Sequence, residues 1–334
     1  MFKKRIITKK ITACAIFSLL VLFSAQGPVR AMEISAGPVV WYAWWSPYFK
    51  NFFALRCPRK AMIYHVSQNV VPVESRWNES GAFLYGPLLS VKLSESWSLG
   101  SAFITSSPYN QSGGHTKLIS GNSFRYKDIS IKMRKYDSDT TITYAVLPYL
   151  KVFGGFKYQG YAYHSRRRAT YAVDIASSSI NPVTYGYKSD SDGYGAGLGL
   201  GVTLPIWEDL YVIGNFSGIY LNSSNAFMEK YLAANGSGAL NRQNQHFYSW
   251  GMNGNLSLAY YIPAASITIS AGFRFQILKM FCSRLVNSLY NNTSTLNEII
   301  VLNRGLEYSS KDLFNKTVDY FYGAALAVTY NFKI

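Results

Sequence analysis

The last residues of the chain, DYFYGAALAVTYNFKI at positions 319–334, alternate between two kinds of side chain. Every second residue from Tyr320 to Ile334 is aromatic or aliphatic, whereas the positions between them are mostly small or polar. Successive side chains of a β-strand point to opposite faces of a sheet. The alternation therefore predicts a strand with one apolar face and one largely polar face.

The same alternation occurs at 266–280 and at 244–262. Because the stretch from Phe247 to Phe273 contains no charged residue, a membrane-spanning helix is the competing interpretation. Pro263 would break such a helix midway, and its Asn and Ser side chains would be spread around the whole circumference. Two strands joined at 263–265 explain the same residues without either penalty.

Extended toward the N-terminus, the alternation predicts ten strands, with 126–147 kept as one long strand although Asp137-Ser138-Asp139 could form a turn. Short and long connections alternate, as in barrels that cross a membrane, and ten strands place both chain ends on the side of the short turns. Twelve strands are the alternative if 50–80 contains another strand. The predicted strands are 34–49, 81–93, 97–107, 126–147, 151–164, 186–204, 209–221, 244–262, 266–280 and 317–334, and the predicted long loops are about 50–80, 108–125, 165–185, 222–243 and 281–316.

The first 31 residues form a predicted signal peptide. They begin with a cluster of Lys and Arg, continue with an apolar stretch at 11–23, and end at the small-residue site Val29-Arg30-Ala31. An apolar stretch of about 13 residues is too short for a membrane-spanning helix, which needs about 20. A lipoprotein box around Cys14 is the alternative, but the apolar core follows this cysteine instead of preceding it.

The composition is basic and rich in aromatic residues. Aromatic residues make up 16% of the chain, with 27 Tyr, and charged residues only 15%, well below the roughly 25% of ordinary soluble domains. Removal of the signal peptide leaves 27 Lys and Arg against 17 Asp and Glu, a formal charge of about +10. This charge favours anionic neighbours such as lipopolysaccharide phosphates. Export excludes nucleic acid as the expected partner.

With these features the chain resembles bacterial outer-membrane β-barrel proteins, which finish on a strand whose aromatic-rich outward face is recognised during assembly. The resemblance implies an all-β fold, a single transmembrane antiparallel up-and-down barrel over 32–334, in the outer membrane of a Gram-negative-type bacterium. It implies outer-membrane lipid and the assembly machinery as partners. A soluble secreted β-sandwich is the alternative fold. These families usually end in Phe, whereas this chain ends in Ile; the candidate assembly signal is Leu326, Val328, Tyr330, Phe332 and Ile334.

Several polar residues fall on the inward faces of the predicted strands. In the hairpin around Pro148, Asp139 and Lys157 are expected as diagonal neighbours. A run of alternate glycines, Gly193 to Gly201, faces the same interior and predicts a narrow, strongly curved wall. The candidate lumen-lining residues are Lys92, Asp139, Lys157, Asn255, Arg274 and Asp319.

The leading functional hypothesis is restricted, porin-type passage of small solutes. The alternative is a non-conducting surface protein that binds through its long loops, and a third is an outer-membrane lipid hydrolase. A ten-stranded barrel is barely wider than an eight-stranded one, whose interior is just filled by side chains, and this weakens the channel hypothesis.

No catalytic residue is assigned. Omptin-like outer-membrane proteases need acidic pairs and a His-Asp couple; Asp137 and Asp139 supply one pair, but Asn244 stands two residues before His246 where Asp is required. His65-Val66-Ser67 has the His-x-Ser spacing of lipid hydrolases but no clear third partner. The four histidines have no ligand spacing, so neither a metal nor another cofactor is expected.

Two cysteines remain after removal of the signal peptide. In a closed barrel the first and last strands are neighbours, and the predicted loops that carry Cys57 and Cys282 emerge close together. Because disulfides persist in exported proteins, a Cys57–Cys282 bridge is expected.

Overall fold

The computed structural model describes residues 33–47, 71–72, 81–112, 118–120, 123–127, 130–166, 170–174, 179–233, 238–291 and 318–333. In this part of the chain the only helical segment is a three-residue 3-10 turn, η1 (Pro263–Ala265). No helix among these residues is long and apolar enough to cross a membrane.

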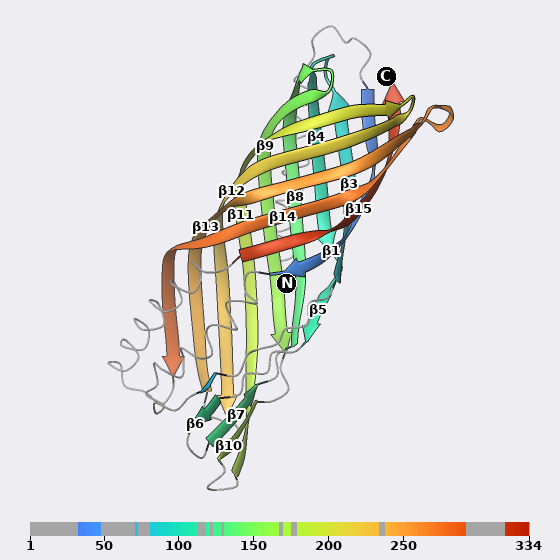
Figure 1. Cartoon of the computed structure of the whole chain (residues 1–334). Helices are drawn as coiled ribbons and strands as arrows, with labels where there is room; N and C mark the ends of the chain where they lie inside the picture. Colours follow the sequence, from blue (N-terminus) through green and yellow to red (C-terminus); the bar gives the residue numbers. More distant parts are fainter. Residues whose placement is uncertain are drawn as a thin grey trace.

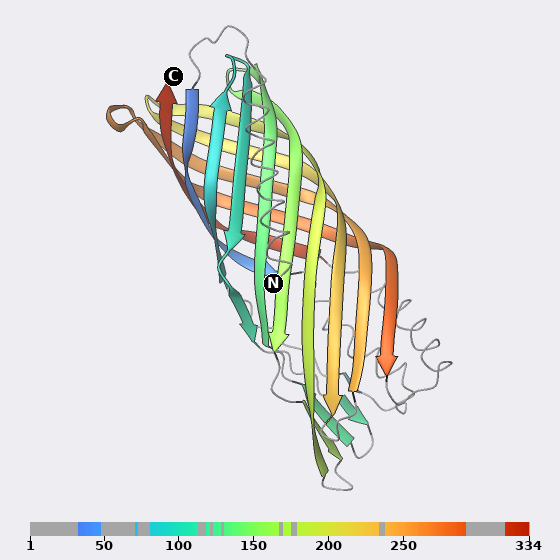
Figure 2. The same ribbon diagram turned by 180° about the vertical axis from the view of Figure 1, so that it is seen from behind.

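Ten strands form a closed antiparallel barrel, which confirms the predicted fold class and strand number (Figures 1 and 2). Each strand pairs with its neighbours in the chain order of the barrel, and the last strand pairs with the first. The segment 126–147 is not divided at Asp137-Ser138-Asp139, which lie within one strand. The ten strands are β1 (Glu33–Ser46), β3 (Gly81–Lys92), β4 (Trp97–Ser106), β8 (Ser130–Leu147), β9 (Leu150–Arg166), β11 (Ser179–Trp207), β12 (Leu210–Ala233), β13 (Gly238–Ile262), β14 (Ile267–Asn291) and β15 (Val318–Lys333).

Short turns join the strands at one end of the barrel. Glu33 at the start of β1 pairs with both Lys333 and Lys92, so the first strand begins and the last strand ends at this same end. Five short strands lie toward or beyond the opposite end, where β5, β6, β7 and β10 are labelled in Figure 1. They are β2 (Val71–Pro72), β5 (Tyr109–Ser112), β6 (Leu118–Ser120), β7 (Ser123–Lys127) and β10 (Thr170–Asp174).

Four consecutive strands are much longer than the alternation indicated. β11, β12, β13 and β14 contain 29, 24, 25 and 25 residues, whereas β1, β3 and β4 contain 14, 12 and 10. Most of the range 222–243, predicted as a loop, is therefore a paired hairpin of β12 and β13. We use the name extended wall for the part of β11–β14 that lies farther from the short turns than Trp250 of β13 and the residues level with it on the neighbouring strands.

β14 contains a β-bulge in its pairing with β13 and bends sharply (Figure 2). His246 pairs with Arg284 and Phe247 pairs with Cys282, so Ser283 is an extra residue on β14. The Ser283 hydroxyl donates a hydrogen bond to the His246 carbonyl oxygen at 2.9 Å. Bulges bend the strand that carries them, and β14 turns sharply partway along its length (Figure 2).

The outer surface carries an apolar belt. On β13 the outward residues Met252, Leu256 and Leu258 are between 41% and 60% exposed, and they lie between Trp250 and Tyr260. Ten residue steps on a strand tilted by about 45° cover about 24 Å, close to the ~25 Å apolar band of membrane barrels. An apolar surface of this extent needs lipid or another apolar partner, so the barrel is a transmembrane barrel.

Aromatic residues border the belt on both sides and contact one another across strands, for example Trp97 with Tyr144 at a ring separation of 4.8 Å. Tyr and Trp are favoured where one end of the side chain is in lipid and the other in water. The girdle beside the short turns includes Trp97, Tyr144, Tyr149, Trp207, Tyr260, Tyr330 and Phe332, and the opposite girdle includes Tyr42, Trp44, Phe83, Tyr248, Trp250, Tyr320 and Tyr322.

A charge placed in the middle of the belt should destabilise the barrel. We expect Leu256→Arg to lower the free energy of unfolding in lipid bilayers by about 2–4 kcal/mol, because the guanidinium would face hydrocarbon. Glu208→Arg introduces the same side chain in the exposed turn after β11 and should leave stability nearly unchanged. Denaturant titration of refolded protein in liposomes measures both; equal stability of the two variants would show that the belt does not face lipid.

Candidate functional site

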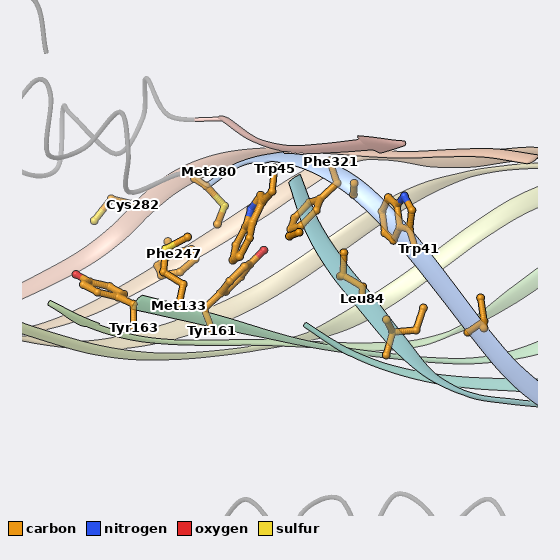
Figure 3. Packing of buried hydrophobic residues seen from close by; sticks show 14 residues of the cluster. Trp41, Trp45, Leu84, Met133, Tyr161, Tyr163, Phe247, Met280, Cys282 and Phe321 are labelled. Atoms are coloured by element: carbon orange, nitrogen blue, oxygen red, sulfur yellow. The ribbon is translucent and has the colours of Figure 1, made fainter. Parts of the chain in front are cut away.

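The interior of the barrel contains a cluster of buried apolar side chains, which we call the interior plug. Trp45 of β1 stacks on Phe321 of β15 at a ring separation of 4.8 Å and on Tyr161 of β9 at 5.9 Å. In Figure 3, Tyr161 points from one wall toward Trp45 of the other. Members come from eight strands of the barrel, so the plug crosses the lumen. Its members are Val39, Trp41, Ala43, Trp45, Ala82, Leu84, Ile104, Met133, Tyr161, Tyr163, Phe247, Met280, Cys282 and Phe321.

The plug arises where strands are apolar on both faces. The segment VVWYAWW at 39–45 places Tyr42 and Trp44 outward and Trp41 and Trp45 inward, the latter two each only 1% exposed. Phe321 likewise interrupts the otherwise small or polar inward face of β15 and is fully buried. These inward aromatics were not predicted as site residues. Their signal in the sequence was the loss of alternation at these positions.

A cluster of buried charges lies in the same interior, and we call it the charge cluster: Lys135, Asp137, Asp139, Lys157 and Arg274. The Lys157 ammonium contacts one carboxylate oxygen of Asp137 at 2.8 Å and one of Asp139 at 2.7 Å. Lys135 lies 3.6 Å from Asp137, and Arg274 lies 3.6 Å from Asp139. Because Lys135, Asp137 and Lys157 are almost completely buried, each charge depends on its partners for stabilisation.

The charge cluster and the plug are joined through Lys135 and Asp319. The Lys135 ammonium is fully buried and lies 3.6 Å from the centre of the Phe321 ring, a cation–π contact. The Asp319 carboxylate accepts hydrogen bonds from the Trp45 indole N–H at 3.0 Å and from the Tyr161 hydroxyl. Buried polar atoms are therefore held by the aromatic residues that fill the lumen.

A polar cavity of about 390 Å³ lies between the charge cluster and the short turns. Its wall includes paired amides and hydroxyls: Asn215 donates to Asn255 at 2.9 Å, and Ser217 donates to Asn253 at 2.8 Å. Gly199, in the predicted glycine run, sits where a Cβ atom would lie 2.5 Å from the Phe153 ring. The absence of a side chain at this position thus lets neighbouring strands approach closely.

The six candidate lumen residues occupy three places. Asp139, Lys157, Asn255 and Arg274 line the cavity, and Asp319 lies within the plug. Lys92 is 53% exposed at the short-turn end, 3.9 Å from Glu33. Lys135 and Asp137 were missed, although they share the inward face of β8 with Asp139 and could have been found by counting every second residue.

Asp139 and Lys157 are directly opposite each other, not diagonal as expected. The turn between β8 and β9 is one residue shorter than predicted, because β9 begins at Leu150, and the register shifts by one more residue between Ala145 and Leu147. Together the two changes turn the diagonal pair into a direct one. Two other lumen candidates, Asn255 of β13 and Arg274 of β14, are also directly opposite each other.

The residues compared with the omptin pattern lie on opposite faces of the barrel wall. Asp137 faces the interior and is 3% exposed, whereas Asn244 and His246 share the exposed, outward face of β13. These residues therefore do not form one catalytic site. His65 and Ser67 lie outside the described residues, and the residues that are described contain no group of three or more potential metal ligands.

Two further expectations concern residues only partly described. Cys282 is buried at the edge of the plug, but Cys57 lies outside the described residues, so the disulfide stays a prediction. Among the assembly-signal candidates, Leu326, Tyr330 and Phe332 point outward and are 45–48% exposed, and Ile334 is outside the described residues.

No protein-family model matches the chain, and no curated protein is significantly similar in sequence. Among solved structures, the outer membrane protease OmpT from Escherichia coli is 15% identical, with a TM-score of 0.49, over 92% of this chain and 100% of that chain. The Ralstonia pickettii toluene transporter TbuX is 7% identical, with a TM-score of 0.30, over 92% and 90% of the two chains. At these values the comparisons leave the function open, and the class of protein follows from the chain's own strand pairing and outer surface.

Removing the central cation should destabilise the barrel. Lys157→Met leaves the carboxylates of Asp137 and Asp139 without their nearest partner, so we expect a loss of about 3–5 kcal/mol in the free energy of unfolding. Lys92→Met removes only an exposed pair, and should change stability by less than about 1 kcal/mol. The double variant Lys157→Met/Asp137→Asn should recover part of the loss. Equal effects at Lys157 and Lys92 in denaturant titrations would contradict a structural role for the charge cluster.

Proposed function

We propose that the protein is an outer-membrane barrel that does not conduct through its centre and that acts as a surface-exposed binding protein through its extended wall. The observation that carries this proposal is the interior plug. In a ten-stranded barrel the lumen is narrow enough for side chains to fill it, and here aromatic rings from β1, β9 and β15 stack across it.

Opening a path through the plug would be energetically expensive. Each large aromatic side chain buries about 150–250 Å², and breaking a buried ion pair costs about 3–5 kcal/mol. Trp45 and Phe321 are held both by stacking and by their contacts with Asp319 and Lys135. A small solute provides no equivalent interaction, which favours a permanently filled centre over a pore that opens spontaneously.

The extended wall supports the second half of the proposal. β13 begins at Gly238, twelve residues beyond Trp250 in the aromatic girdle, or about 40 Å along the strand axis. Membrane barrels turn short loops toward the periplasm and long ones toward the outside, so the extended wall is assigned to the cell exterior. Binding sites on barrels are commonly carried by such projecting segments.

Restricted passage of small solutes is the second candidate function, and the polar cavity favours it. The cavity provides space for a solute over the part of the lumen between the short turns and the charge cluster. For passage to occur, the plug would have to rearrange on the other side of that cluster.

Electrical recording distinguishes the two functions. In planar bilayers we expect no stepwise conductance from wild-type protein, and none from Trp44→Ala, which removes an outward aromatic residue. The triple variant Trp41→Ala/Trp45→Ala/Phe321→Ala removes inward rings and should give measurable conductance, provided that its heat-modifiable migration on gels shows a folded barrel. Reproducible steps from the wild-type protein would favour the channel.

The assigned orientation is tested on intact cells. An epitope inserted directly after Ala233, the last residue of β12, should be labelled by antibody without permeabilisation. The same epitope inserted between Ala264 and Ala265, in a short turn, should be labelled only after the outer membrane is opened. The reverse labelling pattern would show that the extended wall faces the periplasm, and the proposal of surface binding would then be wrong.

A further inference from the structure

We propose that the polar cavity on the short-turn side of the charge cluster binds a small hydroxylated monocarboxylate, with Arg274 as the residue that holds the carboxylate. This inference concerns the part of the lumen that the plug leaves unfilled, and it does not depend on whether the barrel conducts.

Contacts within the protein hold the Arg274 guanidinium in place but leave its N–H donors available for a ligand. One side lies against the Trp41 ring, with the central carbon 4.9 Å from the ring centre. The nearest carboxylate oxygen, on Asp139, is 3.6 Å away, too far for a good hydrogen bond. Within the described part of the chain no acceptor takes a hydrogen bond from Arg274, and its side chain is 19% exposed in the wall of the cavity. A planar fork of N–H donors therefore faces open space.

The charges around Arg274 favour an anion with a single negative charge. Asp139 accepts a hydrogen bond from Lys157 at 2.7 Å, and Lys157 donates another to Asp137 at 2.8 Å, so both of the near donors of Asp139 and Asp137 come from the same ammonium group. Lys135 is fully buried against Phe321 and does not line the cavity. Of the two cations that line the cavity, Lys157 and Arg274, only Arg274 has no carboxylate oxygen within good hydrogen-bond distance, so its donors can receive one carboxylate. A phosphate dianion would bring a second negative charge close to Asp139, with no further cation to receive it.

Part of the cavity wall is suited to hydroxyl groups, whereas Leu88, Phe153 and Ile219 make other parts apolar. Arg274 is directly opposite Asn255, and the neighbouring amides of Asn215 and Asn253 also line the wall. Thr141 and Thr143 of β8 add hydroxyls toward the short turns. A volume of about 390 Å³ lies within the range of about 300–1,000 Å³ of small-molecule sites. A chain of hydroxyl groups attached to the carboxylate would replace water at these donors and acceptors.

Calorimetric titration of refolded protein in detergent tests the proposal with gluconate and sorbitol, two open-chain polyols that differ in the carboxylate. We expect gluconate to bind with a Kd near 1 mM, the range of a single weak site, and sorbitol to show no saturable binding. Arg274→Gln should weaken gluconate binding by about tenfold or more, and Arg274→Lys, which keeps the charge but loses the fork, should weaken it less. Lys92→Gln, a cation outside the cavity, is the matched control and should bind like wild type.

A second variant leaves Arg274 in place. A Cβ atom at Gly197 would lie 3.4 Å from the nearest heavy atom, the Gly218 carbonyl oxygen, so a side chain fits there and projects into the cavity. Gly197→Val should therefore weaken gluconate binding while the barrel stays folded. The proposal is overturned by no gluconate binding at about 10 mM, by phosphate binding more tightly than gluconate, or by folded Gly197→Val and Arg274→Gln proteins that bind like wild type.

Discussion

Within the hydrocarbon of a membrane every backbone N–H and C=O must find a partner in the protein, because no water is available. The pairing of β1 with β15 satisfies this requirement for the two strands that would otherwise leave open edges. It also fixes the strand number at ten, and the strand number fixes the width of the lumen. The alternation of apolar outward and mixed inward side chains, the narrow interior and the need to fill it all follow from this closure.

The interior is divided into two regions of different chemistry. Aromatic and aliphatic side chains fill the region on one side of the charge cluster, and paired amides and hydroxyls surround a cavity on the other. Lys157 lies between them and binds carboxylates on the neighbouring strand. The charges of the centre are therefore balanced both between the adjacent strands β8 and β9 and across the lumen, where Arg274 of β14 lies 3.6 Å from Asp139 of β8, and the plug likewise joins opposite walls.

The sequence predicted the strands and the outward faces well, since both follow from local alternation, as in Leu326, Tyr330 and Phe332 of β15. It did not predict that Trp45, Tyr161 and Asp319 meet, because their contact depends on the closure of the barrel and not on any local pattern. The predicted ends of β11–β14 on the side of the extended wall also lie closer to the membrane than the ends in the structure. Beyond the lipid both faces of a strand can be polar, so the alternation that marks a strand fades although its hydrogen-bonded pairing continues to Ala233.

The plug also lies across the seam where the barrel closes. Trp45 and Phe321 belong to the first and the last strand, and Tyr161 reaches Asp319 from the far wall. Contacts between residues so distant in sequence form slowly, because a long segment of chain must first be ordered. Until β1 and β15 pair, the aromatic surfaces of these side chains remain uncovered. After the two strands have paired, separating them also requires the stacked rings to come apart, so the plug stabilises the closed barrel.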